Sequence, residues 1–288
     1  LRALAPDLTA AELVWQIIDG LDLLAVCSAM ADGAGAEPDG QAPLIELDDV
    51  SFSYADGADN ALEHISLSVK RGETVGIIGG TGAGKSTLVN LLPRFYDATE
   101  GSVKIKGADV RTWKMRELRA LFGVVPQKAA LFSGTIRDNL KWGKEDASDE
   151  ELWTAARIGE AAEFLTALLD GLDHPVEQGG RNLSGGQRQR LTIARALVRQ
   201  PEILILDDSA SALDYATDAR LRKNIRGLAG RTTAIIVSQR VSAIRNADRI
   251  YLLDDGRIAA VGTHEALFSS SERYREICAS QHVGEEEA

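Results

Sequence analysis

The chain has 288 residues, of which 44% are hydrophobic and 26% are charged, a balance that is typical of a soluble globular protein and excludes a disordered or fibrous chain. Thirty-two Lys and Arg against 43 Asp and Glu give a net charge of −11, so the field of the whole chain repels polyanions and argues against nucleic acid as the main ligand. The two cysteines, Cys27 and Cys278, lie near opposite ends. They indicate neither a disulfide framework nor a zinc site, which fits a reducing compartment.

The first 43 residues predict a helix followed by a linker. Residues 1–30 have a helical pattern, whereas residues 31–43, ADGAGAEPDGQAP, are small, polar and interrupted by Gly and Pro. The apolar stretch 13–30 contains one glutamine and two aspartates, so we expect no membrane span there, and it lacks the basic start of a signal peptide. Because position 1 is Leu, we expect the chain to be part of a longer polypeptide.

A folded domain is predicted over residues 44–282, with an acidic tail at 283–288. Strands are predicted early, at 44–54, 65–70 and 73–79. Helical patterns follow at 85–92, 135–142, 149–158, 161–169 and 185–198, which makes 135–199 a predicted helical subdomain. Short apolar runs at 122–126, 203–206, 232–238 and 249–253 alternate with helical segments, the pattern of a buried parallel sheet.

Residues 79–86, GGTGAGKS, match the phosphate-binding pattern G-x-x-x-x-G-K-[ST] between a predicted strand and a predicted helix. Glycines let backbone N–H groups turn toward phosphate oxygens, and the helix N-terminus adds its dipole. Lys85 is predicted to reach the terminal phosphates, and the Ser86 hydroxyl to ligate Mg²⁺. The predicted nucleotide-binding residues of this P-loop are Gly79, Gly80, Thr81, Gly82, Ala83, Gly84, Lys85, Ser86 and Thr87. A flexible Gly-rich turn is the alternative interpretation.

A second strand, ILILDD, ends in acid and places Asp207 at the carboxyl end of the predicted sheet. P-loop enzymes hold their metal-side carboxylate at this position, so Asp207 is predicted to join Ser86 in binding Mg²⁺. The alternative is a solvated aspartate of the kind that ends many buried strands.

The segment between these two sites resembles the signature of ABC ATPases: LSGGQ at 183–187, followed by RQRLTIARALVRQPEILILDD. The resemblance covers about residues 44–280. It is strengthened by Tyr54, by Gln127 in VVPQ and by SALD at 211–214, in the order that the family shows. It implies an α/β P-loop fold with a parallel-sheet core, an antiparallel β subdomain that carries Tyr54 and a helical subdomain that carries LSGGQ. It also implies ATP and Mg²⁺ as cofactors.

The resemblance assigns further roles. Tyr54 would stack on adenine, and Gln127 would link Mg²⁺ and the attacking water to the transport partner. In this family two ATPase domains pair head to tail, so the signature loop faces the γ-phosphate held by the other domain, again at a helix N-terminus. The residues implied in that contact are Ser184, Gly185, Gly186 and Gln187. The local alternative is an N-cap serine followed by two loop glycines.

Several segments, among them VVPQKAALFSGTIRDNL and VEQGGRNLSGGQ, are similar to ABC exporters, in which a membrane domain precedes the ATPase domain. Residues 1–43 would then be a connector. Residues 132–139 and 177–180 would receive coupling helices from the membrane domains, unless they are ordinary loops. The implied location is the cytoplasmic face of the cell membrane, within a transporter.

Two positions depart from the family pattern. Most hydrolytic members have Glu after the metal-side aspartate, where this chain has Asp208, and most have His where this chain has Gln239. A carboxylate that is one methylene shorter misaligns a general base, and an amide cannot carry positive charge at the transition state. With Lys85, these are the predicted catalytic residues. We therefore hypothesise a degenerate site in one half of a heterodimeric exporter that binds ATP and hydrolyses it slowly.

Three alternatives stay open beside this hypothesis. The two substitutions can be tolerated in an active homodimeric exporter ATPase. A soluble ABC ATPase of the chromosome-maintenance or DNA-repair type is disfavoured by the acidic net charge and by the absence of a long heptad segment or zinc module between the P-loop and LSGGQ. A regulatory nucleotide-binding subunit without turnover is the third. The transported substrate is not readable from the sequence.

Overall fold

The computed structural model describes residues 33, 35, 39–55, 59–209 and 212–281. The predicted helix at 1–30 and the predicted acidic tail at 283–288 lie outside these residues. The chain divides into two compact units. Among the described residues, the sheet unit comprises 33, 35, 39–55, 59–122 and 229–281, and the helical unit comprises 123–209 and 212–228.

The sheet unit contains an antiparallel sheet in the order β2-β1-β4-β5. Its strands are β1 (Ile45–Phe52), β2 (Leu62–Val69), β4 (Glu100–Ile105) and β5 (Ala108–Asp109). Strand β2 begins three residues before the predicted strand. Register shifts near Val50, with Asp49 and His64 both at positive φ, break the alternation that sequence patterning relies on.

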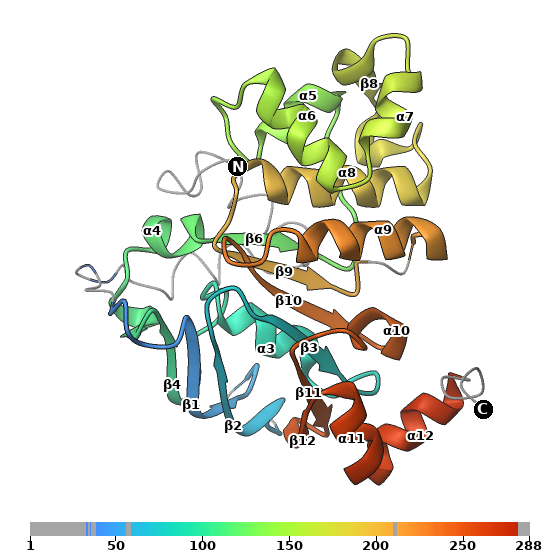
Figure 1. Ribbon diagram of the computed structural model, residues 1–288. Coiled ribbons are helices and arrows are strands. Elements are labelled where there is room, and N and C mark those ends of the chain that lie inside the picture. The colour runs from blue at the N-terminus through green and yellow to red at the C-terminus, as the bar shows by residue number, and fades with distance from the viewer. Residues whose placement is uncertain (1–32, 34, 36–38, 56–58, 210–211, 282–288) are drawn as a thin grey trace. The chain divides into compact units, whose positions relative to one another are not determined.

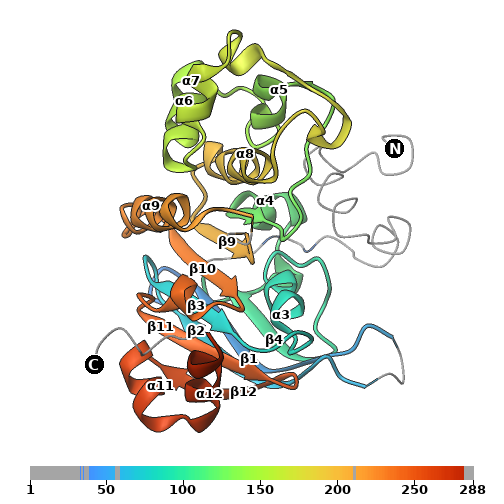
Figure 2. The same ribbon diagram turned by 90° about the vertical axis from the view of Figure 1, so that its right-hand side faces the viewer.

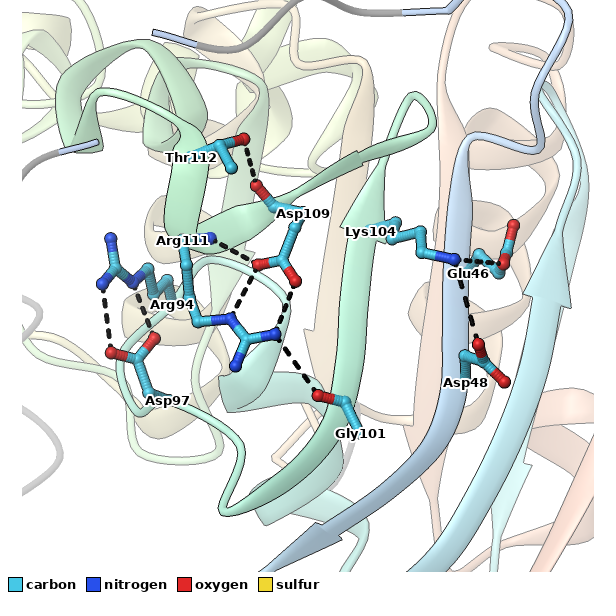
Figure 3. Close-up of polar contacts among 9 residues, drawn as sticks. All are labelled: Glu46, Asp48, Arg94, Asp97, Gly101, Lys104, Asp109, Arg111 and Thr112. Atoms are coloured by element: carbon cyan, nitrogen blue, oxygen red, sulfur yellow. Dashed lines mark hydrogen bonds and ion pairs between the residues drawn. The ribbon is translucent and has the colours of Figure 1, made fainter. Parts of the chain in front are cut away.

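Ion pairs lie on this sheet, one between its two inner strands and one at the end of β5 (Figure 3). Lys104 on β4 stands opposite Glu46 on β1, and its Nζ donates to Glu46 Oε1 at 3.0 Å. Next to β5, Arg111 forms a two-point pair with Asp109 through Nε at 2.9 Å and Nη2 at 2.7 Å. Opposite charges that face each other across strands stabilise a sheet, so the Lys104–Glu46 pair helps to fix the register of β1 and β4.

The second sheet of this unit is mixed, in the order β12-β11-β3-β10. Strands β10 (Thr233–Ser238) and β11 (Arg249–Asp254) flank β3 (Thr74–Ile78), and both are parallel to it, as predicted. Strand β12 (Arg257–Gly262), which was not predicted, adds antiparallel to β11. The turn between them is Asp255-Gly256, with φ of 46° and 72°, which is the backbone of a two-residue hairpin.

Helices complete the sheet unit: α3 (Lys85–Leu91), α4 (Met115–Ala120), α10 (Val241–Ile244), α11 (His264–Ser270) and α12 (Glu272–Ser280). Figures 1 and 2 show α11 and α12 together beside β12. Tyr274 and Cys278 on α12 are fully buried in one core with Val241, Ile244 and Leu252. Helix α12 is therefore anchored in the core rather than lying on the surface.

The helical unit is built on α8 (Gly185–Val198), against which α5 (Ile136–Lys141) and α6 (Asp149–Ile158) pack. It also contains α7 (Ala162–Ala167), α9 (Tyr215–Arg226), the neighbouring strands β9 (Ile203–Asp207) and β6 (Phe122–Val125), and the short strands β7 (Gly134–Thr135) and β8 (Pro175–Val176). Capping boxes begin α5, α6 and α8. In the described part of the chain, no helix has the length and apolar character that crossing a membrane requires.

Candidate nucleotide-binding site

The P-loop follows β3 and opens α3, and its backbone requires glycine at both ends. A Cβ on Gly79 would lie 2.2 Å from the carbonyl oxygen of Leu253, and one on Gly84 would lie 2.7 Å from that of Ala61. Gly84 also has φ of +91°, which favours glycine. By contrast, a Cβ on Gly80 or Gly82 would meet no atom within 4 Å. The middle of the loop is therefore open on the side of these glycines, which is the space that phosphate groups need.

The side chain of Lys85 folds back onto the P-loop. This side chain is buried, and Nζ donates to the carbonyl oxygens of Gly79 at 2.9 Å and Gly80 at 2.6 Å. The ammonium group is thus held at the mouth of the loop, where it adds positive charge to the α3 N-terminus. Ser86, the next residue, is exposed.

Tyr54 is fixed next to the start of α3. Its hydroxyl is hydrogen-bonded to Oγ1 of Thr87 at 2.9 Å, and its ring packs edge-on against Phe52 at 4.9 Å and Tyr96 at 5.3 Å. The side chain remains 57% exposed. Its position beside the P-loop helix fits a ring that stacks on a bound base. Sequence reasoning missed the supporting Tyr96, whose only signal is its place in the aromatic pair FY four residues after α3.

Gln239 comes to the same edge of the sheet as the P-loop. Ser238, the last residue of β10, pairs with Ile78, the last residue of β3. The residues that follow, Gln239 and Gly79, therefore leave adjacent strands side by side, and neighbouring strands are about 4.8 Å apart. The sheet unit thus brings together Tyr54, the P-loop and Gln239.

The helical unit brings together the predicted acidic residues and Gln127. Asp207 ends β9 and is partly buried. Asp208 follows with φ of +42°, an uncommon backbone for a residue other than glycine. Gln127, exposed in the loop after β6, donates through Nε2 to Asp208 Oδ2 at 3.3 Å. Mg²⁺ prefers oxygen ligands, and the carboxylate of Asp207 and the amide of Gln127 each carry an oxygen of this kind.

The signature loop caps α8. Ser184 Oγ accepts from the backbone N–H of Gln187 at 3.2 Å, and Gln187 Oε1 accepts from the N–H of Ser184 at 2.9 Å. A serine hydroxyl that accepts in this way still has its O–H to donate. Gly185 is exposed, and a Cβ there would meet no atom within 4 Å. The loop therefore presents a hydroxyl and a helix N-terminus outward. Asp214 of SALD caps α9 through Thr217, whose backbone N–H and hydroxyl lower the pKa of Asp214; residue 211 lies outside the described residues.

The two segments predicted to receive coupling helices are neighbours. Strand β7 pairs with β8, Gly134 with Val176 and Thr135 with Pro175, which sets residues 132–139 beside 177–180. Each segment is tied by an asparagine whose structural role sequence reasoning missed. Asn139, 1% exposed, bonds both backbone groups of Phe132 at 2.8 and 2.9 Å.

The second segment is tied in the same way. Oδ1 of Asn182 accepts from the N–H of Glu177 at 3.0 Å, and its Nδ2 donates to the carbonyl of Pro175 at 2.8 Å. Arg188 on α8 donates to the carbonyl of Gly180 at 3.3 Å, which joins this segment to the signature helix. In the sequence, Asn139 stands four residues after Thr135, the spacing of one helical turn, and Asn182 stands just before LSGGQ. Neither position alone indicates a structural role.

Comparisons with known proteins identify the family of this chain. The family model for the ABC transporter matches residues 62–211. An uncharacterized ABC transporter ATP-binding protein of Mycobacterium tuberculosis is 44% identical over 246 residues, covering 84% of this chain and 42% of the relative. A multidrug efflux ATP-binding/permease protein of Mycobacterium bovis is 44% identical over 247 residues, covering 83% of this chain and 20% of the relative.

Among solved structures, a bacterial Atm1-family ABC exporter with ATP bound is similar, with a TM-score of 0.82 and 35% identity over 94% of this chain and 48% of that chain. The chain thus spans less than half the length of each of these relatives. Together, the matching family model, the relatives and the fold establish that this chain belongs to the ABC transporter family and contains its ATP-binding domain.

Proposed function

We propose that this chain is the ATP-binding domain of an exporter and drives transport by closing, with bound ATP, onto a second ATPase domain. The observation that carries the proposal is that the chain presents both loops that the proposal assigns to phosphate. One is the P-loop, open at Gly80 and Gly82, and the other is the outward-facing signature cap at Ser184. ATP held by one domain and completed by the signature loop of the other would join the two domains, and hydrolysis would release them.

We also propose that the nucleotide site formed on this chain's own P-loop hydrolyses ATP slowly. The shorter Asp208 carboxylate is held by Gln127, and a base must come within about 2.6–3.2 Å of the water it activates. Gln239 can donate a hydrogen bond to a phosphate oxygen but cannot supply charge. Binding depends on the P-loop, which is intact, so the expected result is retention of ATP with weak turnover. The partner would be an unlike chain with Glu and His at the matching positions, and Ser184 would complete its site.

Coupling to membrane domains is proposed to occur through residues 132–139 and 177–180, at the cytoplasmic face of the cell membrane. Support comes from the β7–β8 pairing and from the ties at Asn139 and Asn182, which make one firm surface of two loops. Phe132 stacks on Trp142, with ring centroids 4.8 Å apart, and adds an aromatic platform to that surface. The exporter relatives favour this role over that of a soluble ATPase acting on chromosomes.

The test is Mg-ATP turnover by the purified chain over a concentration series, with ATP binding measured in the same samples. The Asp208→Glu, Gln239→His double variant is measured alongside. Binding without turnover, restored in the double variant, is the expected result. Turnover that rises faster than linearly in the unmodified chain would instead establish an active homodimer. Absence of ATP binding would contradict the whole proposal.

A further inference from the structure

One side chain near the end of the described chain holds the backbone around Gln239. Gln281, which follows α12, donates through Nε2 to the carbonyl oxygen of Gln239 at 2.7 Å. Its Oε1 accepts from the backbone N–H of Val241 at 2.8 Å. Only one orientation of the amide satisfies both backbone groups. The N–H of Arg240 in turn donates to Ser238 Oγ at 3.0 Å, so three successive backbone groups of this segment are bonded.

These bonds replace a missing helix cap. Helix α10 has four residues, and its N-cap residue, Arg240, makes no side-chain capping bond. The first N–H groups of a helix have no partner inside the helix, so they must find one elsewhere. The carboxamide of Gln281 supplies that partner for Val241 from another element, 40 residues later in the sequence.

The anchoring of α12 explains why Gln281 reaches this point. Tyr274 and Cys278 are fully buried against Val241 and Ile244. Gln281 lies three residues after Cys278 and donates its N–H to the Cys278 carbonyl at 3.1 Å, so it continues the buried face of the helix. The core contact of α12 therefore directs the amide at residues 239–241.

The pairing of β10 with β3 places the segment held by Gln281 beside the P-loop. Gln239 leaves β10 beside Gly79, the first residue of the P-loop. We propose that Gln281 is a positioning residue that fixes the Gln239 backbone and so sets how the Gln239 side chain meets the terminal phosphate of ATP. This inference rests on the proposed function, which puts Gln239 at the γ-phosphate.

The experiment measures the affinities of the 288-residue chain for Mg-ATP and Mg-ADP by calorimetry. Four chains are compared: unmodified, Gln281→Met, Gln239→Ala, and the two changes together. Methionine keeps the shape of glutamine but makes neither hydrogen bond. The expected result is that Gln281→Met lowers the preference for ATP over ADP roughly ten-fold, leaves ADP affinity unchanged, and has no further effect in the Gln239→Ala chain.

Ser280→Ala is the matched control, because its hydroxyl donates only within α12, to the carbonyl of Ile277. It should leave both affinities unchanged. The inference would be overturned if Gln281→Met lowered ADP affinity as much as ATP affinity. It would also be overturned if Gln281→Met lowered the ATP preference of the Gln239→Ala chain as much as it does that of the unmodified chain. Either result would mean that the substitution destabilises the whole unit.

Hydrogen exchange at the Val241 amide separates this inference from the proposed function. We expect exchange at least ten-fold faster in Gln281→Met, because the amide loses its acceptor. An unchanged rate would overturn the inference even if nucleotide binds normally. If the unmodified chain bound neither nucleotide, the proposed function would fail, and the Val241 exchange rate would still decide whether Gln281 holds the segment.

Discussion

Gln127 donates through Nε2 to Oδ2 of Asp208 at 3.3 Å, although 81 residues separate them in the sequence. The loop that the family resemblance links to the transport partner thereby touches the carboxylate proposed to activate water. Movement of Gln127 would change the hydrogen bonding of Asp208 directly.

Asp208→Glu is expected to raise turnover at this chain's own site about ten-fold or more in the presence of a partner domain, because the carboxylate gains one methylene of reach. ATP affinity should not change, since binding depends on the P-loop. Single-turnover hydrolysis checks this, with Asp208→Asn as the matched control of the same length. Equal rates for the Glu and Asn variants would mean that no base acts from this position.

Lys85→Ala is expected to abolish ATP binding at this chain's own site. The ammonium group lies at the mouth of the P-loop, bonded to the carbonyls of Gly79 and Gly80, and removal of a charge that pairs with phosphate typically costs about 2–5 kcal/mol of binding free energy. Calorimetry with Mg-ATP measures the loss. Lys70→Ala, at an exposed residue that precedes β3 whereas the P-loop follows it, should bind as the unmodified chain does.

Ser184→Ala is expected to separate the two sites. The change removes the α8 cap, which costs about 1 kcal/mol of stability, but leaves the P-loop untouched. ATP affinity of the isolated chain should therefore stay the same, while turnover at a partner's site falls. Loss of the isolated chain's own ATP binding would show that the signature does not act in trans.

Sequence patterning located the elements that carry chemistry because their residues obey strong local rules. GGTGAGKS needs a left-handed Gly84, and LSGGQ contains a capping serine, so both patterns specify a backbone as well as a composition. The missed elements obey weaker rules. Strand β4 starts with exposed residues, and β12 alternates only between exposed and half-buried positions, so neither shows a clear apolar pattern.

Long-range contacts were harder still to foresee. Gln281 and Asn139 bond to backbone groups rather than to side chains, and a backbone acceptor leaves no trace in the sequence. The structural roles of Gln281 and Asn139 become visible only when the fold shows which backbone groups lie next to them. Tyr54 was identified from its family position, yet its bond to Thr87 needed the structure, since 33 residues separate them.

The start of α5 is expected to loosen in acid. The hydroxyl and backbone N–H of Thr135 bond the carboxylate of Asp138 and lower its pKa below the ordinary 3.8. The folded state thus favours the ionised form, so this stabilisation is present above the ordinary pKa and is lost as the pH falls through the lowered value. Hydrogen exchange at the first amides of α5 should accelerate over that range, corrected for intrinsic rates. In Asp138→Asn the change with pH should disappear.

Glu160 joins α8, which follows the signature serine, to α9, which Asp214 caps. Its carboxylate accepts from Arg220 at 2.8 Å and Asn224 at 2.7 Å, both on α9, while its carbonyl accepts from Arg190 on α8 at 2.9 Å. Glu160 has φ of +58° just after α6, a position where glycine is favoured. The side-chain contacts therefore outweigh an unfavourable backbone.

Two substitutions of Glu160 separate the effect of its side-chain contacts from the effect of its backbone conformation. Glu160→Gly removes the strain of a positive φ but also removes the hydrogen bonds from the Glu160 carboxylate to α9. We therefore expect Tm to fall by about 2–4 °C. Glu160→Gln keeps an acceptor for Asn224 and loses only the charge that faces Arg220, so its effect should be smaller. Calorimetric melting measures both, with the exposed Glu163→Gln as control for a change of charge in the same region. A Tm that rises in Glu160→Gly would mean that backbone strain, not the link between α8 and α9, dominates at this residue.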